Sequence, residues 1–306
     1  MTESKTRVSY LMSRLEASSS AGVRRAVEYA EDADLDGIGL GDHVSFRVGA
    51  GADGLVGAAS VLAASDRLRA VVGVYLLPLR HPVLVARQIT DISTLAPGRL
   101  VLGVGIGGED PHEFEICGVD PRTRGRRMDE CLQVLRALLP GEPVDFDGEF
   151  FRLENASIRP GLAAPVPILI GGRSDAAIRR AGQLGDGWFG IWVSSSRYAQ
   201  AIEQMAHAAS EAGREQVSWH NALNVWCGVG SDRTDARGYV ASAMEQFYKV
   251  PYERFEKWSP AGSPEQIAEF LAPYVDAGCH TFNVIACGES LEAEITAVGE
   301  IRKRLR

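Results

Sequence analysis

The residues that could carry chemistry gather just after short apolar runs of the chain. One such run is followed by Gly171-Gly172-Arg173-Ser174, and a helical pattern begins there. Paired glycines let the backbone approach a ligand closely, and the start of a helix offers free N–H groups. Arg173 adds a forked cation suited to phosphate. These residues predict a phosphate-binding turn, and a tight turn with a solvated arginine is the structural alternative.

Two further clusters lie in equivalent places. Gly103-Val104-Gly105 is continued by Ile106-Gly107-Gly108, but Pro111 interrupts the helix that a dinucleotide fingerprint requires. A glycine backbone that lines a flat ring explains the run better. His43 ends another apolar run and could exchange a proton with a ligand, although a purely structural histidine would look the same. Glu109-Asp110 could serve acid–base chemistry or form a solvated loop pair.

The elements that must position these residues alternate regularly. Apolar runs predict eight strands, and amphipathic or well-capped segments between them predict helices. Ser263, for example, can cap a helix that has Pro264 in its first turn and Gln266 at the capping-box position. Strands that alternate with helices form a parallel sheet, and a count of eight favours one closed barrel over a doubly wound open sheet. In such a barrel the active site forms at the carboxyl ends of the strands. The predicted strands cover residues 8–12, 37–41, 68–75, 99–103, 167–170, 187–190, 223–229 and 279–285.

Two segments interrupt this rhythm. Residues 140–166 carry Pro, Gly and a short alternating stretch, which predicts an inserted hairpin, and residues 246–262 are aromatic and irregular. Both are predicted as insertions on the carboxyl-terminal rim of a single α/β domain that covers residues 1–306. Aromatic side chains of the rim loops suggest an apolar pocket, although rim packing or a dimer surface would explain them equally well.

Composition excludes several classes of protein. A net charge of −8 gives no basic excess for nucleic acid, so none is expected as a partner. The five cysteines (Cys117, Cys131, Cys227, Cys279 and Cys287) form no C-x-x-C pair, which argues against a disulfide framework or a zinc site. The chain starts without an apolar leader and carries no apolar stretch long enough to span a membrane. We therefore expect a cytoplasmic protein.

In their order and spacing these pieces resemble the bacterial luciferase-like monooxygenase superfamily, in its branch dependent on the deazaflavin coenzyme F420. The resemblance covers nearly the whole chain. The pieces that carry it are Gly41-Asp42-His43, Gly73-Val74-Tyr75-Leu76-Leu77-Pro78-Leu79-Arg80-His81-Pro82, Arg99-Leu100-Val101-Leu102-Gly103-Val104-Gly105, Ile168-Leu169-Ile170-Gly171-Gly172, Gly185-Asp186-Gly187-Trp188 and the segment from Ser263 to Phe282.

The resemblance implies a cofactor ring at the carboxyl-terminal mouth of the barrel, with His43 beside it as the catalytic residue. It implies a bulge at Gly73-Val74, often with a non-prolyl cis peptide bond, that backs the ring. One departure matters: some members place a glutamate where this chain has Ile106. The implied cofactor-binding residues are Asp42, Gly73, Val74, Gly103, Val104, Gly105, Ile170, Gly171, Gly172, Arg173 and Ser174.

Three functions follow as hypotheses. The first is hydride transfer between coenzyme F420 and a small organic substrate, in which the protein supplies position and electrostatics. The second is an FMN-dependent monooxygenase that uses reduced flavin and dioxygen. The third is a barrel that binds a flavin without catalysis, since fold alone does not fix function. A homodimer is expected from the resemblance, and the identity of the substrate stays open.

Overall fold

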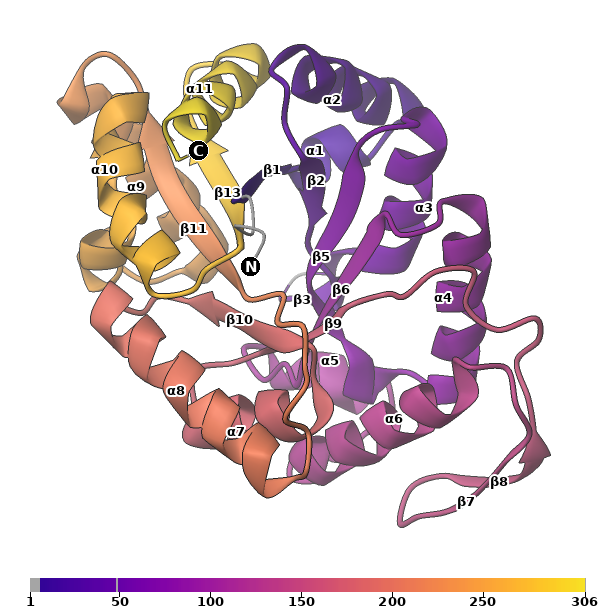
Figure 1. Cartoon of the computed structure of the whole chain (residues 1–306). Coiled ribbons are helices and arrows are strands. Elements are labelled where there is room, and N and C mark those ends of the chain that lie inside the picture. The colour runs from indigo at the N-terminus through magenta and orange to yellow at the C-terminus, as the bar shows by residue number, and fades with distance from the viewer. Residues whose placement is uncertain (1–5, 48, 306) are drawn as a thin grey trace.

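The computed structural model describes residues 6–47 and 49–305. Eight parallel strands close into a barrel, because β10 pairs with both β9 and β11 while β1 pairs with both β2 and β13 (Figure 1). This confirms the predicted barrel over the open sheet. The strands are β1 (Arg7–Leu11), β2 (Gly37–Leu40), β5 (Arg69–Leu76), β6 (Leu100–Gly105), β9 (Ile168–Gly171), β10 (Gly187–Ile191), β11 (Ala222–Val229) and β13 (Thr281–Cys287).

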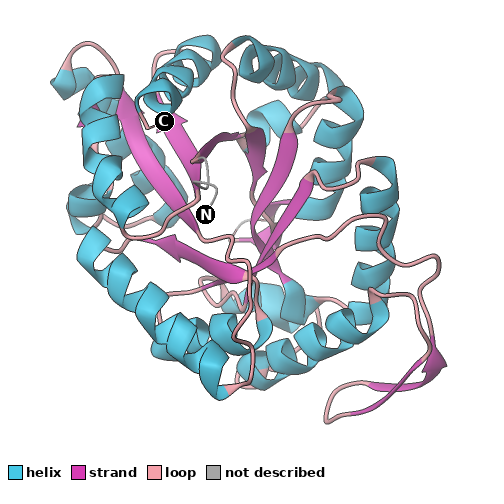
Figure 2. Cartoon of the chain, in the orientation of Figure 1, coloured by secondary structure: helices cyan, strands magenta, loops and turns pink. Residues whose placement is uncertain are grey.

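A ring of helices covers the outside of the barrel (Figure 2). Their starts follow local chemistry: Ser263 and Gln266 form the predicted capping box, and Pro82 occupies a first-turn position that needs no N–H bond. The main covering helices are α2 (Ser20–Asp32), α3 (Gly54–Ala64), α4 (Pro82–Leu95), α6 (Arg124–Leu138), α7 (Asp175–Leu184), α8 (Ser195–Glu211), α10 (Pro264–Asp276) and α11 (Leu291–Arg304).

The barrel strands are buried on both faces, as strands covered by helices must be. In β2, β6 and β9 every residue is buried, and the outward side chains join the helices in one large core. A smaller cluster fills the barrel interior, and it consists of Val71, Val101, Leu169, Phe189 and Ala222, with Val74 packed against it.

Shorter elements decorate both ends of the barrel. At the carboxyl ends lie the hairpin β3–β4, the helix α5 and the long helix α9, and the sequence predicted none of these three. The long helix α9 covers Arg233–Tyr248. The shorter elements are α1 (Arg14–Ala17), β3 (His43–Phe46), β4 (Ala50–Ala52), η1 (Leu77–Leu79), α5 (Pro111–Ile116), β7 (Val144–Asp147), β8 (Arg152–Ala156), η2 (Tyr252–Arg254), η3 (Glu256–Trp258) and β12 (Ala261–Gly262).

The two predicted insertions lie at opposite ends of the barrel. Residues 246–262 reach the carboxyl-terminal rim as predicted, because β12 pairs with the end of β11 at Gly228 and Val229. Residues 140–166 do form a hairpin, β7–β8, but its predicted place on that rim is wrong. The hairpin connects α6 to β9, and a segment that leaves a helix and enters a strand lies at the amino ends of a parallel barrel's strands. It projects away from the ring in Figure 1.

Within the described ranges, no helix is both long enough and apolar enough to cross a lipid bilayer.

Candidate active site

A bulge in β5 marks the centre of the barrel's carboxyl-terminal mouth. The register between β5 and β6 shifts between Val72 and Tyr75, and the Gly73–Val74 peptide bond is cis, so the bulge that the resemblance implied is confirmed. Both residues are partly exposed although most of β5 is buried. The bulge therefore presents backbone and the Val74 side chain to the mouth.

Val74 lies between two glycines of neighbouring strands. A Cβ atom on Gly105 would lie 2.5 Å from Val74 Cγ2, and one on Gly171 would lie 2.8 Å from Val74 Cγ1. Real Cβ atoms do not approach carbon so closely, so each position requires glycine while Val74 stays in place. Gly105 and Gly171 thus make room for the side chain of Val74, which forms a platform at the mouth.

Below this platform the interior is closed by Phe189. A Cβ atom on Gly103 would lie 2.6 Å from Phe189 Cδ1, and one on Gly73 would lie 2.8 Å from Phe189 Cζ. Gly103 is buried and makes room for this ring, and not for a ligand. A flat ligand at the mouth would therefore have room only above Val74, on the solvent side of the bulge.

The turn after β9 fits the predicted phosphate site. Gly172 has φ +126°, and the Trp188 indole donates a 2.7 Å hydrogen bond to its carbonyl from the buried side. In a trans peptide the next N–H points the opposite way, so the N–H of Arg173 points away from Trp188. The first turn of α7 adds N–H groups without intrahelical acceptors. Ser174 caps this helix by accepting from Ala177 N, and its hydroxyl proton stays available to a ligand.

Arg173 is exposed beside this turn and lies over the Trp192 ring, 5.3 Å from its centroid. Val104 and Ile170 are buried in the core shared with the helices, so they support the glycine backbone and do not face the mouth. A phosphate held at this turn would meet a cation and several N–H donors. The turn, the platform and Arg173 together fit a flat ring that carries a phosphate.

Asp42, which was predicted to contact the cofactor, is instead buried beneath the mouth of the barrel. Its side chain has no exposed surface, and it pairs with Arg80 through two hydrogen bonds of 2.6 and 2.8 Å. It also accepts from Gly54 N and Leu76 N. These bonds tie the end of β2 to the end of β5. We therefore assign Asp42 a positioning role in place of the direct contact.

His43 follows directly and is held by a buried carboxylate. Its Nδ1 lies 3.0 Å from Oε2 of Glu113, whose side chain is 3% exposed, while the histidine side chain is 24% exposed. The other oxygen of Glu113 accepts from Val44 N at 2.7 Å and from Ser45 N at 3.1 Å. Helix α5 supplies this glutamate, and sequence reasoning missed it. A histidine held by a carboxylate in this way can exchange a proton with a ligand, as general acid–base chemistry requires.

Glu109 also lies in this part of the mouth. Desolvation by the surrounding protein raises the pKa of its carboxyl group, and nearby His43, when protonated, and the charges of Arg173 and Arg47 oppose that rise. The residue itself is exposed to solvent. Asp110, its neighbour, instead caps α5 through His112 N. The structure thus separates the predicted acidic pair into one carboxyl group near His43 and one structural cap.

An aromatic wall, consisting of Phe46, Phe247, Trp226 and Tyr248, begins at His43. The His43 and Phe46 rings are 4.3 Å apart, and Phe46 and Phe247 stack at 5.2 Å. Trp226 donates a 3.2 Å hydrogen bond to the Tyr248 hydroxyl. This bond satisfies the Trp226 N–H, whereas the Tyr248 hydroxyl keeps its own proton to donate. The rest of the wall consists of apolar ring surface.

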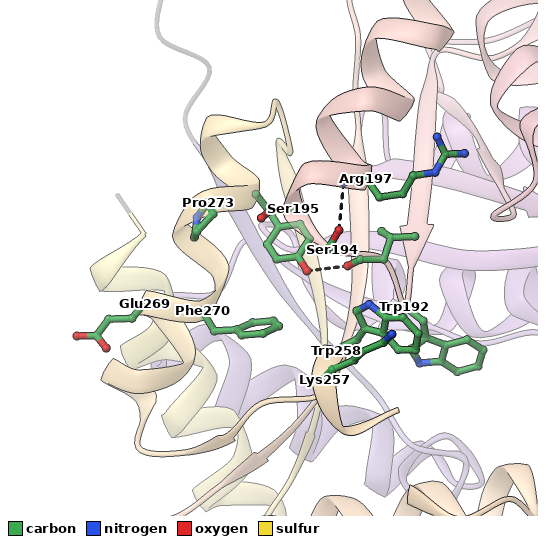
Figure 3. Close-up of a pocket in the computed structure, with 11 residues that line it drawn as sticks. Trp192, Ser194, Ser195, Arg197, Lys257, Trp258, Glu269, Phe270 and Pro273 are labelled. Atoms are coloured by element: carbon green, nitrogen blue, oxygen red, sulfur yellow. Dashed lines mark hydrogen bonds between the residues drawn. The ribbon is translucent and has the colours of Figure 1, made fainter. Parts of the chain in front are cut away.

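A separate cavity of about 630 Å³ lies between the start of α8, η3 and α10, and Figure 3 shows the Phe270 ring pointing into it. Trp192 lines this cavity and also contacts Tyr248 at the mouth, so its indole separates the two spaces. A second cavity, of about 540 Å³, is lined by His43, the β3–β4 hairpin and Arg80. Among the described residues no group of three or more His, Cys, Asp or Glu side chains is placed to hold a metal ion.

Comparison with known proteins places this site in a family. A family model described as luciferase-like monooxygenase matches residues 10–257. An uncharacterized protein of Mycobacterium tuberculosis is 36% identical over 156 residues, which cover 51% of this chain and 54% of that protein. The chain thus spans about half the length of this relative. An F420-dependent glucose-6-phosphate dehydrogenase of Nocardia farcinica is 27% identical over 281 residues, covering 81% of this chain and 83% of that enzyme.

Solved structures agree on the fold. An F420-dependent secondary alcohol dehydrogenase in complex with an F420-acetone adduct superposes with a TM-score of 0.86 at 19% identity, covering 99% of both chains. The oxygenating constituent of 3,6-diketocamphane monooxygenase from Pseudomonas putida, in complex with FMN, gives 0.77 at 17% identity and covers 98% of both chains. Because the family model matches most of this chain, the chain belongs to the luciferase-like monooxygenase family.

Proposed function

We propose that the protein transfers a hydride between coenzyme F420 and a small organic substrate that carries an alcohol or carbonyl group. The observation that carries this proposal is the buried Glu113 behind His43, at the same end of the barrel as the Val74 platform. A proton must leave or join the substrate oxygen when a hydride moves at the adjacent carbon. A histidine held in one orientation suits that task.

The cofactor would rest on Val74, with its phosphate at the turn formed by Gly172, Arg173 and Ser174. When bound, the deazaflavin ring would supply the redox chemistry. The role of the chain is to hold ring and substrate within reacting distance. Relatives named as F420-dependent dehydrogenases support the choice of cofactor.

The hydrogen bonds of Glu113 fix the tautomer of His43. A carboxylate only accepts, so the neutral imidazole carries its proton on Nδ1, at the 3.0 Å contact. Nε2 then keeps a free lone pair that can accept the hydroxyl proton of an alcohol. In the reverse direction the protonated ring returns that proton to the carbonyl oxygen.

The aromatic wall supports an apolar substrate. Phe247 is a large apolar side chain left 38% exposed, and it lies one ring away from His43. An alcohol or ketone with an alkyl or aryl group would cover this surface and exclude water from His43. A sugar phosphate would meet few free donors on this wall. Ile106, where some relatives have a glutamate, is consistent with a substrate other than a sugar phosphate.

A turnover assay tests the proposal. Protein loaded with oxidised F420 is mixed with a series of secondary alcohols and with glucose 6-phosphate, and the loss of cofactor absorbance is followed. We expect turnover of apolar alcohols, abolished or at least 100-fold slower in His43→Asn. Turnover with reduced FMN and dioxygen, and none with F420, would instead establish the monooxygenase alternative, which the FMN-bound structural neighbour favours. Saturable flavin binding without any turnover would support the non-catalytic barrel.

Three further expectations belong to this proposal. The chain forms one domain over residues 1–306, it acts as a homodimer, and it resides in the cytoplasm. Light scattering of the purified protein would decide the oligomeric state, and a mass of one 33.0 kDa chain would contradict the dimer.

A further inference from the structure

Two asparagines lie inside the barrel directly beside the bulge. Asn224 on β11 and Asn283 on β13 are register partners on adjacent strands. Asn283 is fully buried, whereas Asn224 is partly exposed. Buried polar amides cost free energy unless they are hydrogen-bonded, so the hydrogen bonds of these two amides identify what they hold.

The two amides form a hydrogen-bond relay, in which each amide nitrogen donates toward the bulge. Asn283 Nδ2 donates to Asn224 Oδ1 at 2.7 Å, and Asn224 Nδ2 donates to the Gly73 carbonyl at 3.2 Å. Gly73 is the first residue of the bulge, and its carbonyl belongs to the peptide that leads into Val74. The relay therefore ends on the backbone of the platform.

Asn283, the first residue of this relay, is held in place by packing against β2. A Cβ atom on Gly39 would lie 1.8 Å from Asn283 Oδ1, so this oxygen packs directly on the backbone of β2. It has no hydrogen-bond partner within the described part of the chain. An unpaired buried oxygen is costly and is retained where the same amide does something else. Here the amide nitrogen supports Asn224.

We propose that Asn224 and Asn283 are positioning residues that hold the Gly73 carbonyl, and through it Val74, in the place where the cofactor ring rests. This rests on the proposed function, because it concerns the ring and not its phosphate. Loss of the Asn224 donor releases the carbonyl, and Val74 then moves relative to Gly105 and Gly171. The ring loses its flat support, while the turn after β9 is unchanged.

The sharpest variant is Asn224→Asp. It keeps size and can still accept from Asn283, but as a carboxylate it cannot donate to the Gly73 carbonyl. The titrations are therefore made at about pH 9, where this partly exposed carboxyl group is ionised. Asn221→Asp is the matched control: Asn221 is also buried, donates to Gly278 O and accepts from Trp188 N, but it lies at the amino-terminal end of β11. Dissociation constants for oxidised F420, and for the same chromophore without phosphate, are measured by absorbance titration together with melting temperatures.

We expect Asn224→Asp to weaken both ligands at least tenfold and to change the absorbance shift of the bound chromophore. We expect Asn221→Asp to lower the melting temperature and leave both affinities within about twofold. Wild-type affinity in folded Asn224→Asp overturns the inference. If that variant does not fold, Asn283→Asp, which loses the donor one step further away, is measured in the same way and must also weaken both ligands. Failure of the wild-type protein to bind either F420 or FMN would instead overturn the proposed function.

Discussion

Glu113→Gln separates a catalytic role for the His43 pair from a structural one. In the variant the amide oxygen can still accept from Val44 and Ser45, at the 2.7 and 3.1 Å contacts of the present carboxylate oxygen. The amide nitrogen then occupies the position 3.0 Å from His43 Nδ1 and donates to it. The opposite placement would press an amide donor against two backbone donors, so it is disfavoured.

The imidazole must then carry its proton on Nε2. It loses the lone pair that accepts a proton from the substrate alcohol, although the ring stays in place. General base catalysis contributes roughly 10²–10⁴-fold to rate, so kcat for alcohol oxidation should fall by that order. Folding should change little, by about 1–2 kcal/mol for the lost charge-assisted bond, because the two backbone donors keep an acceptor.

The assay compares alcohol oxidation, cofactor affinity and melting temperature, with ¹⁵N NMR of the histidine nitrogens as the direct readout of the tautomer. Glu115→Gln is the matched control, since Glu115 lies on the same short helix, contacts His112 and is 70% exposed. An unchanged kcat in Glu113→Gln, or an Nδ1 proton retained in the variant, would refute the assignment of His43 as base.

Two further predictions concern pH and the aromatic wall. Burial lowers the pKa values of His220 and His280 below 6.5, at the amino-terminal end of the barrel, so the folded state favours their neutral forms. The contribution of these two histidines to stability is therefore fully present above about pH 6.5 and is lost as pH falls through their lowered pKa values. The melting temperature of His220→Asn should depend less on pH than that of the wild-type protein. The control is His207→Asn, at an exposed position, which should behave like the wild-type protein. Phe247→Ala should raise KM for apolar alcohols about tenfold and change it little for the smallest alcohol, because burial of a half-exposed ring contributes about 1–2 kcal/mol to binding. Tyr239→Ala is the control, since Tyr239 also lies on α9 and is about equally exposed. Equal KM values in the two variants would contradict the role of the aromatic wall.

The fold was largely predictable because its signals are local. Alternation of apolar runs and capped helices predicted the barrel, and Ser263 with Gln266 predicted a helix start that the structure confirms. The sequence did not predict helix α9, because its apolar residues do not recur with helical spacing. Asp232, which caps the helix by accepting from Thr234 N and Asp235 N, was the signal that could have indicated it. The end of the barrel at which the β7–β8 hairpin lies was also predicted wrongly. The order of elements determines it, because the hairpin follows a helix and precedes a strand.

The site was predictable only where one segment carries it. The Gly73-Val74 bulge and the Gly172-Arg173 turn are local features, and both lie at the mouth as expected. Glu113 and Asn224 escaped because each acts across the barrel on a segment 70 or 151 residues away. A glycine is also ambiguous in sequence: Gly103 makes room for Phe189, whereas Gly105 makes room for Val74. Only the packing of distant strands distinguishes these roles.

We infer that a flat ring rests on Val74 while its phosphate binds the turn after β9. The most direct measurement is the affinity of wild-type protein and Arg173→Ala for F420 and for the same deazaflavin chromophore without phosphate. We expect the wild-type protein to bind the phosphorylated cofactor at least 100-fold more tightly than the phosphate-free ring. We expect Arg173→Ala to remove much of this difference without weakening the phosphate-free ring. Equal affinity of the wild-type protein for both ligands, or a loss in Arg173→Ala that is the same for both, would contradict it.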